Sequence, residues 1–267
     1  MHMPPFALVL TAAGSSLRFS SAFAEGEGVK KEFLKIDGHT VLYRAAEPFF
    51  ELPGLSAVVV TCREGAEDET LVAMEDLVDV GSVPMLFIRG GATRQESVHL
   101  ALERLAALDL PFEYVAVHDG ARPFVTPDLI VRTLAMAYTT RSGAMPALAV
   151  TDSVRRIDAA GRIVELPRRE GLVRVQTPQV FDFSKLLDAH RKAQGDDATD
   201  DGEIFVSAGY ECFVIEGDEA NRKITYESDI PDARAQVMEY VRARDRGRED
   251  RAHDEMFRSF VHQGGGQ

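Results

Sequence analysis

Short apolar runs alternate with segments of helical period along most of this chain, and this alternation constrains the fold more than any other sequence feature. The apolar runs predict strands at residues 6–10, 57–61, 84–88 and 114–117. The segments between and after them predict helices at residues 68–79, from Thr93 to about Leu108, and from Pro127 onward. Strands that alternate with helices in this order form a mostly parallel sheet with helices on both faces. The sequence therefore predicts the α/β class.

Two of the predicted helices begin at recognisable capping sequences. Thr93 followed by Glu96 fits a capping box, in which the threonine hydroxyl and the glutamate carboxylate accept backbone N–H groups of the first turn. Thr126 is a suitable N-cap residue for the next helix, because Pro127 would occupy its first position.

The pattern changes after Ala149. Short strands are predicted at residues 153–157 and 163–166, on either side of a turn at 158–161, and they form a hairpin. Residues 151–176 contain six arginines and four acidic residues, a local net charge of +2 in an acidic chain. We interpret this segment as a β-arm that projects from the sheet, and arms of this kind often pair with a second subunit.

The remaining segments complete one large domain. Helices are predicted at residues 183–194 and 228–246, on either side of a strand at 212–215. A length of 267 residues allows one large α/β domain with an appendage. We therefore predict a single domain over residues 1–240, with the arm at about 150–176. Residues 241–267 are predicted to form a helical extension or a flexible tail.

Charge and composition exclude several classes of protein. The chain has 43 acidic and 30 basic residues, a formal net charge of -13, which argues against a protein that coats nucleic acid or an anionic membrane. Its two cysteines are far apart, so a disulfide framework or a structural zinc site is not expected. The N-terminal residues do not resemble a signal peptide, and no apolar run is long enough to span a bilayer. We expect a cytoplasmic location.

Candidate site residues follow the predicted strands, because α/β sheets bind ligands at the carboxyl ends of their strands. The first strand leads into the turn T-A-A-G-S-S-L-R-F, whose small residues allow a ligand to approach the backbone. Taken alone, this segment favours a tight strand–helix turn with solvated cations nearby. The glycine-rich fingerprints of dinucleotide-binding proteins and of P-loop enzymes are both absent.

A second candidate follows the strand at 114–117, in the sequence H-D-G-A-R-P. Asp119 would lie at the end of a buried strand, where its carboxylate could bind Mg²⁺. The alternative is a structural ion pair between Asp119 and Arg122. His118 alone is more typical of a hydrogen-bonded structural residue than of a general base.

Together, these motifs occur in an ordered series that is more specific than any one of them. The series resembles the 2-C-methyl-D-erythritol 4-phosphate cytidylyltransferase family from about Phe6 to Ile230. The matching motifs are AAG…R at 12–18, K-x-F-L at 31–34, GG…R-x-x-S-V at 90–98, HDGARPFVT at 118–126, TPQ-x-F at 177–181, TDD at 199–201 and EG…N-x-K-I-T at 216–225.

The resemblance implies a fold, a reaction and a set of residue roles. It implies a homodimeric nucleotidyltransferase with a Rossmann-like core, an interlocking arm, and Mg²⁺ as cofactor. The reaction would join CTP and 2-C-methyl-D-erythritol 4-phosphate and release pyrophosphate. By matching position, the triphosphate would meet Arg18 and Lys31, which with Lys223 form the catalytic set. The other implied contacts are Ala12, Ala13, Gly14, Gly90, Gly91, Ser97 and Asp119 with CTP, Asp119 also with the metal, and Arg169, Thr199 and Lys223 with the acceptor phosphate. Arg169 would reach that phosphate from the arm of the partner subunit.

Several positions depart from the family pattern. Val29 and Lys30 precede Lys31 where the family commonly has proline, and residues 20–28 resemble an insertion, so Lys30 is an alternative to Lys31. Ala92 and Thr93 replace an acidic pair.

The implied chemistry is consistent with the residues. The acceptor is a phosphate monoester, already ionised at neutral pH, so the reaction needs cations and Mg²⁺ rather than a general base. Alternative interpretations are a cytidylyltransferase for another polyol phosphate, such as ribitol 5-phosphate, and a catalytically silent nucleotide-binding protein. A dinucleotide-dependent oxidoreductase is disfavoured because its glycine fingerprint is missing.

Overall fold

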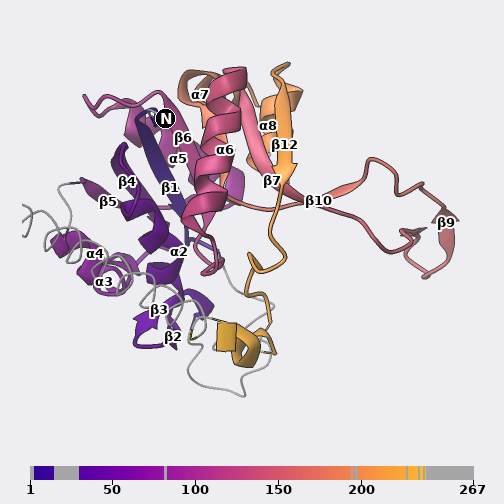
Figure 1. Cartoon of the computed structure of the whole chain (residues 1–267), viewed down its shortest axis with the longest axis horizontal. Coiled ribbons are helices and arrows are strands. Elements are labelled where there is room, and N and C mark those ends of the chain that lie inside the picture. Colours follow the sequence, from indigo (N-terminus) through magenta and orange to yellow (C-terminus); the bar gives the residue numbers. More distant parts are fainter. Residues whose placement is uncertain are drawn as a thin grey trace, which may run out of the picture.

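The computed structural model describes residues 3–14, 30–80, 83–193, 195, 198–226, 228–233, 235, 236 and 238. At its centre lies an eight-stranded sheet (Figure 1). Four of its strands run parallel in the order β5-β4-β1-β6, and all four were predicted. They are β1 (Phe6–Thr11), β4 (Leu55–Cys62), β5 (Met85–Arg89) and β6 (Tyr114–Asp119).

The other half of the sheet is mixed. Strand β11 (Gln179–Asp182) lies antiparallel between β6 and β7 (Gly143–Ala149), and β7 pairs in turn with β10 (Val173–Val175) and β12 (Cys212–Glu216). Of these, only β12 was predicted. Strand β7 contains Gly143 and Pro146, which are poor strand formers. A Cβ atom at Gly143 would lie 2.8 Å from Phe181 Cδ1 and 2.9 Å from Cys212 Sγ, so the close packing around this strand requires glycine.

Helices cover both faces of the sheet, as predicted for this class. Along β1 the side chains alternate: Phe6, Leu8 and Leu10 enter one apolar cluster, whereas Ala7 and Val9 enter the other. The first cluster includes residues of α2 (Val41–Phe50) and α6 (Pro127–Thr140). The second includes residues of α5 (Arg94–Ala106), α7 (Phe183–Lys192) and α8 (Asp201–Ser207). The Rossmann-like α/β class is confirmed.

The helix ends test the capping predictions. Thr93 Oγ1 accepts the N–H of Glu96 at 3.1 Å, and Thr126 Oγ1 accepts the N–H of Leu129 at 3.3 Å, so both predicted N-caps are confirmed.

The predicted single helix at 68–79 was wrong. Two short helices, α3 (Glu67–Val72) and α4 (Glu75–Val80), replace it, and the turn between them allows Met74 to be fully buried in the first apolar cluster. Helices α2 and α8 were not predicted.

The chain between β7 and β10 forms the predicted arm. Its tip is a hairpin of β8 (Arg156–Ile157) and β9 (Ile163–Glu165), and it extends away from the rest of the molecule (Figure 1). Four large apolar side chains at this tip are more than half exposed: Ile157, Ile163, Val164 and Leu166.

Smaller elements lie below the sheet in Figure 1: the 3₁₀ turn η1 (Lys31–Phe33), and the pair β2 (Lys35–Ile36) and β3 (His39–Thr40). Near the C-terminus, residues 229–233 are helical, which agrees with the start of the helix predicted at 228–246. The predicted tail at 241–267 lies outside the described residues. Among the residues described, no helix is long and apolar enough to cross a membrane.

Candidate active site

A cavity of about 680 Å³ opens at the carboxyl ends of β1, β4 and β6, next to the loop that follows β5. This is where a parallel sheet is expected to bind its ligand, and the volume lies within the usual range for small-molecule sites. The residues that line it are Thr11, Ala13, Gly14, Lys31, Glu32, Thr61, Arg63, Gly91, Ala92, Thr93, Arg94, Ser97, Asp119, Ala121, Lys223 and Thr225.

One wall of the cavity consists of two loops packed together without intervening side chains. A Cβ atom at Gly90 would lie 2.5 Å from Ala13 Cβ and 2.7 Å from Ser97 Oγ. Only glycine at position 90 therefore allows the loop after β5 to lie against the turn after β1. The Gly91 N–H donates to Ser97 Oγ at 3.0 Å, which fixes the path of the loop.

The first turn of α5 closes this wall. Ser97 Oγ donates to the Thr93 carbonyl at 2.8 Å, and the Glu96 carboxylate accepts the N–H of Ala92 at 2.6 Å. The capping residues therefore hold the loop at 91–93 in place. Ala92 and Thr93, which depart from the family pattern, both line the cavity.

Asp119, the last residue of β6, lies at the electrostatic centre of the site. Its Oδ2 atom lies 2.9 Å from Lys223 Nζ and 3.3 Å from Arg122 Nε, while its Oδ1 atom lies 3.8 Å from Arg94 Nε. Burial alone would raise the pKa of Asp119, but these three cations together hold it well below its usual range. Asp119 is therefore an ionised carboxylate that faces a surplus of positive charge. The ion pair with Arg122, considered as an alternative role, exists alongside the others.

His118 supports this aspartate from inside the sheet. Its ring is fully buried; Nδ1 lies 2.9 Å from Thr177 Oγ1 and Nε2 lies 3.2 Å from the Arg122 carbonyl. Thr177 Oγ1 also accepts the N–H of Asp119 at 3.1 Å. Burial lowers the pKa of His118 to about 4, so the ring is neutral near pH 7. With both ring nitrogens engaged, His118 is a structural residue, as its sequence context suggested.

The segment after β12 brings Lys223 to the cavity. Asn221 is fully buried, and its side chain donates to the Thr177 carbonyl at 2.8 Å. Arg122 Nη1 donates to the Asn221 carbonyl at 2.9 Å, and the Ile224 N–H donates to the Ala121 carbonyl at 2.8 Å. These bonds join the segment to the loop after β6 on both sides of Lys223, and they direct its ammonium group to Asp119.

Of the two neighbouring lysines, it is Lys31 that lines the cavity. Its Nζ atom donates to the Ile224 carbonyl at 3.0 Å and lies 4.0 Å from Glu32 Oε1. Lys30 is buried, and its Nζ atom lies 5.5 Å from the centre of the Phe33 ring. The geometry therefore favours Lys31 over Lys30 as a ligand-binding residue.

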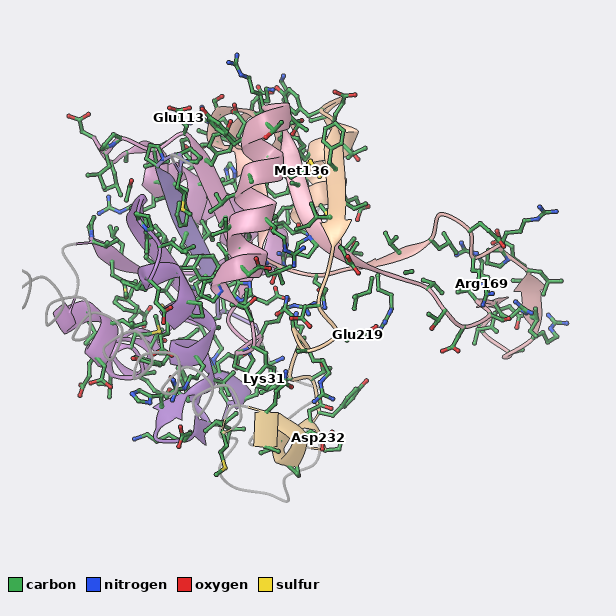
Figure 2. All side chains as sticks on the ribbon, in the orientation of Figure 1. Lys31, Glu113, Met136, Arg169, Glu219 and Asp232 are labelled. Carbon is green, nitrogen blue, oxygen red and sulfur yellow. The ribbon has the colours of Figure 1, made fainter. Side chains whose placement is uncertain are left out.

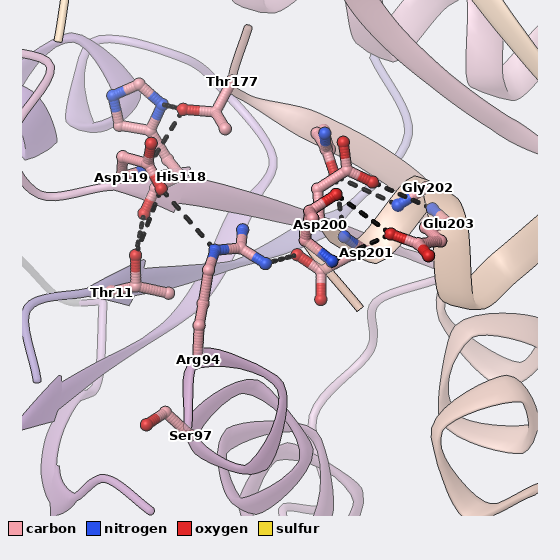
Figure 3. A network of polar contacts seen from close by, with 12 residues as sticks. Thr11, Arg94, Ser97, His118, Asp119, Thr177, Asp200, Asp201, Gly202 and Glu203 are labelled. Atoms are coloured by element: carbon pink, nitrogen blue, oxygen red, sulfur yellow. Dashed lines mark hydrogen bonds and ion pairs between the residues drawn. The ribbon is translucent and has the colours of Figure 1, made fainter. Parts of the chain in front are cut away.

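Arg94 is a cavity residue that sequence reasoning missed. It lies at the first position of α5 and extends between two carboxylates, Asp119 and Asp201, with its Nη1 atom 2.8 Å from Asp201 Oδ2 (Figure 3). Arg94 belongs to the quoted motif at 90–98, but nothing in the sequence indicates that Asp201 lies next to it. That contact depends on the packing of α8 against the sheet.

Among the described residues, two with an expected acceptor role do not line the cavity of the single chain. Arg169 lies on the arm, well away from Lys31 (Figure 2), and donates to the Thr151 carbonyl. Thr199 Oγ1 donates to Glu203 Oε2 at 2.9 Å and does not line the cavity. Arg18 lies outside the described residues.

The predicted nucleotide residues are largely brought together. Ala13, Gly14, Gly91, Ser97 and Asp119 line the cavity, and the remaining two, Ala12 and Gly90, adjoin it.

The charge of the cavity indicates what it can bind. Among the described residues that line it, four are basic and two are acidic, a net charge of +2 in a chain whose formal charge is -13. They are Lys31, Arg63, Arg94 and Lys223, against Glu32 and Asp119. A concave site with a local surplus of cations attracts anions. The site can therefore accommodate a polyanionic ligand beside exposed backbone.

Asp119 is the cavity carboxylate that could bind a metal ion. Within the described part of the chain, no group of three or more His, Cys, Asp or Glu side chains could hold a metal alone. Mg²⁺ commonly binds through one or two carboxylates together with substrate phosphates and water. The donor set therefore fits a divalent ion that shares its ligands with a bound phosphate.

Comparison with known proteins places these features in context. The model of the family described as "IspD: 2-C-methyl-D-erythritol 4-phosphate cytidylyltransferase" matches residues 6–239. A curated relative, the "Bifunctional enzyme IspD/IspF" of Rhodopseudomonas palustris (strain HaA2), is 41% identical over 234 residues, which cover 86% of this chain and 55% of the relative. The chain thus spans about half the length of the curated relatives it matches.

Two solved structures share the fold over nearly their whole length. The crystal structure of 4-diphosphocytidyl-2C-methyl-D-erythritol synthase from Anaerococcus prevotii DSM 20548 superimposes with a TM-score of 0.70 at 26% identity, covering 88% of this chain and 99% of that one. The crystal structure of 2-C-methyl-D-erythritol 4-phosphate cytidylyltransferase from Thermus thermophilus gives a TM-score of 0.64 at 32% identity, covering 88% and 98%.

Proposed function

This chain belongs to the 2-C-methyl-D-erythritol 4-phosphate cytidylyltransferase family, and we propose that it catalyses the reaction for which the family is named. CTP and 2-C-methyl-D-erythritol 4-phosphate would give 4-diphosphocytidyl-2-C-methyl-D-erythritol and pyrophosphate, a step of non-mevalonate isoprenoid biosynthesis. The observation that supports this most strongly is the cationic cavity itself. Residues from five separate family motifs meet there, represented by Ala13, Lys31, Ser97, Asp119 and Lys223.

The proposed reaction is an in-line displacement at the α-phosphorus of CTP. An oxygen of the acceptor phosphate forms the new bond to phosphorus, and the bond to the bridging oxygen between the α- and β-phosphates breaks. Pyrophosphate leaves with that oxygen and the electron pair. The second pKa of a phosphate monoester is about 6, so the nucleophile needs no base. This agrees with a purely structural role for His118, whose ring nitrogens are both engaged.

The nucleotide would bind along the wall formed by the two loops. Gly14 leaves open space in which the base and ribose could approach the backbone, whereas Gly90 and Gly91 allow the loops of this wall to pack closely, and Ser97 adds a hydroxyl. Lys31, with Arg18, would neutralise the triphosphate. Charge neutralisation by fixed cations is the main contribution a protein makes to phosphoryl-type transfer.

Asp119 would hold the divalent metal ion, which we propose to be Mg²⁺. A metal ion in this position supplies positive charge to the phosphate oxygens and orients them. Lys223 is 38% exposed at its side chain, so it can turn from Asp119 toward an acceptor phosphate. Removal of Mg²⁺ with a chelator should abolish pyrophosphate release. Asp119→Asn should raise the Mg²⁺ concentration needed for half-maximal activity.

The acceptor site would be completed by a second copy of the chain. Arg169 and Thr199 are the remaining residues with an expected acceptor role, and Arg169 is on an arm that leaves its own subunit (Figure 2). The arm also exposes Ile157, Ile163, Val164 and Leu166, which would be covered in a dimer. We therefore propose a homodimer in which each arm brings Arg169 to the partner's cavity. We propose a cytoplasmic enzyme that binds neither nucleic acid nor membranes.

The preference of the enzyme among nucleoside triphosphates tests whether the cavity binds CTP. Pyrophosphate release should be measured with 2-C-methyl-D-erythritol 4-phosphate, Mg²⁺ and each of CTP, UTP, ATP and GTP in turn. We expect CTP to give the highest kcat/KM. Equal rates with all four nucleotides would contradict the assignment of the glycine-rich wall to the cytosine base. CTP binding without pyrophosphate release would instead favour a catalytically silent nucleotide-binding protein.

A further inference from the structure

Arg94 occupies a position that its own helix disfavours. It is the first residue of α5, where the positive end of the helix dipole repels a cation. Two buried carboxylates compensate for this. Although burial opposes it, Asp201 and Asp119 together raise the pKa of Arg94. A residue that breaks a local rule and needs such support is more often functional than incidental.

The backbone of Asp201 is held in place by hydrogen bonds that do not involve Arg94. It is fully buried at the start of α8, and its backbone N–H, like that of Gly202, donates to Gln179 Oε1 at 3.2 Å. These bonds tie the first turn of α8 to strand β11. They fix the backbone of Asp201 but not the rotation of its carboxylate, whose Oδ2 atom lies 2.8 Å from Arg94 Nη1.

The other oxygen of this carboxylate is bound by His190 of α7. His190 Nε2 lies 3.1 Å from Asp201 Oδ1, and neither side chain is exposed to solvent. An ionised carboxylate only accepts hydrogen bonds, so Nε2 must be the protonated nitrogen. Nδ1 of His190 has no partner among the described residues, which leaves Asp201 as the hydrogen-bond partner that orients the ring.

We propose that His190 is a positioning residue: through Asp201 it holds Arg94 in the orientation that the CTP phosphates and ribose meet. This inference rests on the proposed function, because it assigns CTP to the cavity that Arg94 lines. His190 does not line that cavity, so it acts only through the row His190, Asp201, Arg94. The row ends at Asp119, the proposed metal-binding carboxylate.

The physical reason is that the Asp201 carboxylate is held by one contact on each oxygen, to His190 and to Arg94. With only one of these contacts left, the carboxylate can rotate. If the bond to His190 is lost, Asp201 can turn away from Arg94, and Arg94 then has only the longer 3.8 Å contact with Asp119. Loss of one hydrogen bond to a charged group typically changes an equilibrium about ten-fold. We therefore expect an effect of that size on CTP, with a smaller effect on the acceptor.

A matched pair of variants separates the hydrogen bond from packing. His190→Leu removes the donor but keeps an apolar side chain of moderate size, whereas His190→Gln places an amide nitrogen where Nε2 lies. Leu186→Ala, on the same helix and fully buried, controls for a general loosening of α7. The Kd for CTP with Mg²⁺ should be measured by calorimetry for each purified variant, together with KM for both substrates and the temperature of unfolding.

We expect His190→Leu to raise the Kd and KM for CTP about ten-fold. His190→Gln should keep both values within about two-fold of those of the unmodified chain. Leu186→Ala should lower the unfolding temperature without changing either value. In an Arg94→Ala background, His190→Leu should have little further effect, since coupled residues are not additive. Unchanged CTP binding in His190→Leu, or full additivity with Arg94→Ala, would overturn the proposal. Failure of the proposed function appears separately, as tight CTP binding by the unmodified chain without pyrophosphate release.

Discussion

Lys223 Nζ and Asp119 Oδ2 lie 2.9 Å apart, although 104 residues separate them in the chain. The pair joins the segment after β12 to the end of β6. Arg122 and Arg94 also approach the same carboxylate, so three positive charges surround the single negative charge of Asp119. A site with this surplus of cations and a partly exposed lysine is suited to receive phosphates.

Lys223→Ala should separate catalysis from folding. Its side chain is partly exposed, and Arg94 and Arg122 still neutralise Asp119, so we expect a similar temperature of unfolding. Turnover should fall by at least about a hundred-fold because the charge on the transferred phosphate loses a fixed cation. The matched control is Lys192→Ala, an exposed lysine paired with Asp188 on α7. Near-normal turnover in purified Lys223→Ala would exclude the proposed role.

His118 should make the stability of the fold depend on pH. Because burial lowers its pKa to about 4, the unfolded chain takes up a proton below about pH 6.5 that the folded chain does not. The free energy of unfolding should therefore fall as the pH decreases from 6.5 to 4, by about 3 kcal/mol from this residue. Urea unfolding at several pH values should show a shallower dependence for His118→Gln. Parallel curves for the two proteins would contradict the assignment.

Two glycine substitutions should affect different properties, one the KM for CTP and the other the stability of the fold. Gly14 lines the cavity, and a Cβ atom there would meet nothing within 4 Å, so Gly14→Ala should leave the unfolding temperature unchanged. If the nucleotide fills that space, KM for CTP should rise several-fold. A Cβ atom at Gly90 would overlap Ala13 and Ser97, so Gly90→Ala should cost about 1–3 kcal/mol of stability. A Gly14→Ala enzyme with unaltered KM for CTP would show that the nucleotide does not approach this turn.

The proposed exchange of arms can be tested by mixing two inactive variants. Arg169→Ala damages only the arm, and Lys223→Ala damages only the cavity. If Arg169 acts in the partner's cavity, each mixed dimer contains one intact site. Refolding the two variants together in equal amounts should restore about one quarter of normal activity, since half of the dimers are mixed. No recovery, with mixed dimers demonstrated by differential tagging, would place Arg169 in its own subunit's site or in none.

The sequence predicted the strands of the parallel half of the sheet because their apolar runs and β-branched residues, as in β1 and β4, are local signals. Strand β7 could not be predicted in this way. Its Gly143 and Pro146 disfavour a strand locally, and it becomes one by pairing with its neighbours β10, β11 and β12. The single helix predicted at 68–79 failed for the same kind of reason, since burial of Met74 is a tertiary effect.

The candidate site shows the same division. Asp119 and Lys223 could be named from motifs, and the cavity contains both. Arg94 belongs to one of those motifs, but its role depends on Asp201 and His190, which lie far along the chain and reach it only through the packing of α7 and α8.

The acceptor specificity tests the central claim most directly. Pyrophosphate release from CTP and Mg²⁺ should be measured with 2-C-methyl-D-erythritol 4-phosphate and, separately, with ribitol 5-phosphate, using Lys223→Ala as the inactive control. We expect rapid release with 2-C-methyl-D-erythritol 4-phosphate, in equal amount to the cytidylylated product, and at most slow release with ribitol 5-phosphate. A preference for ribitol 5-phosphate, or no release with either acceptor, would contradict the proposed function.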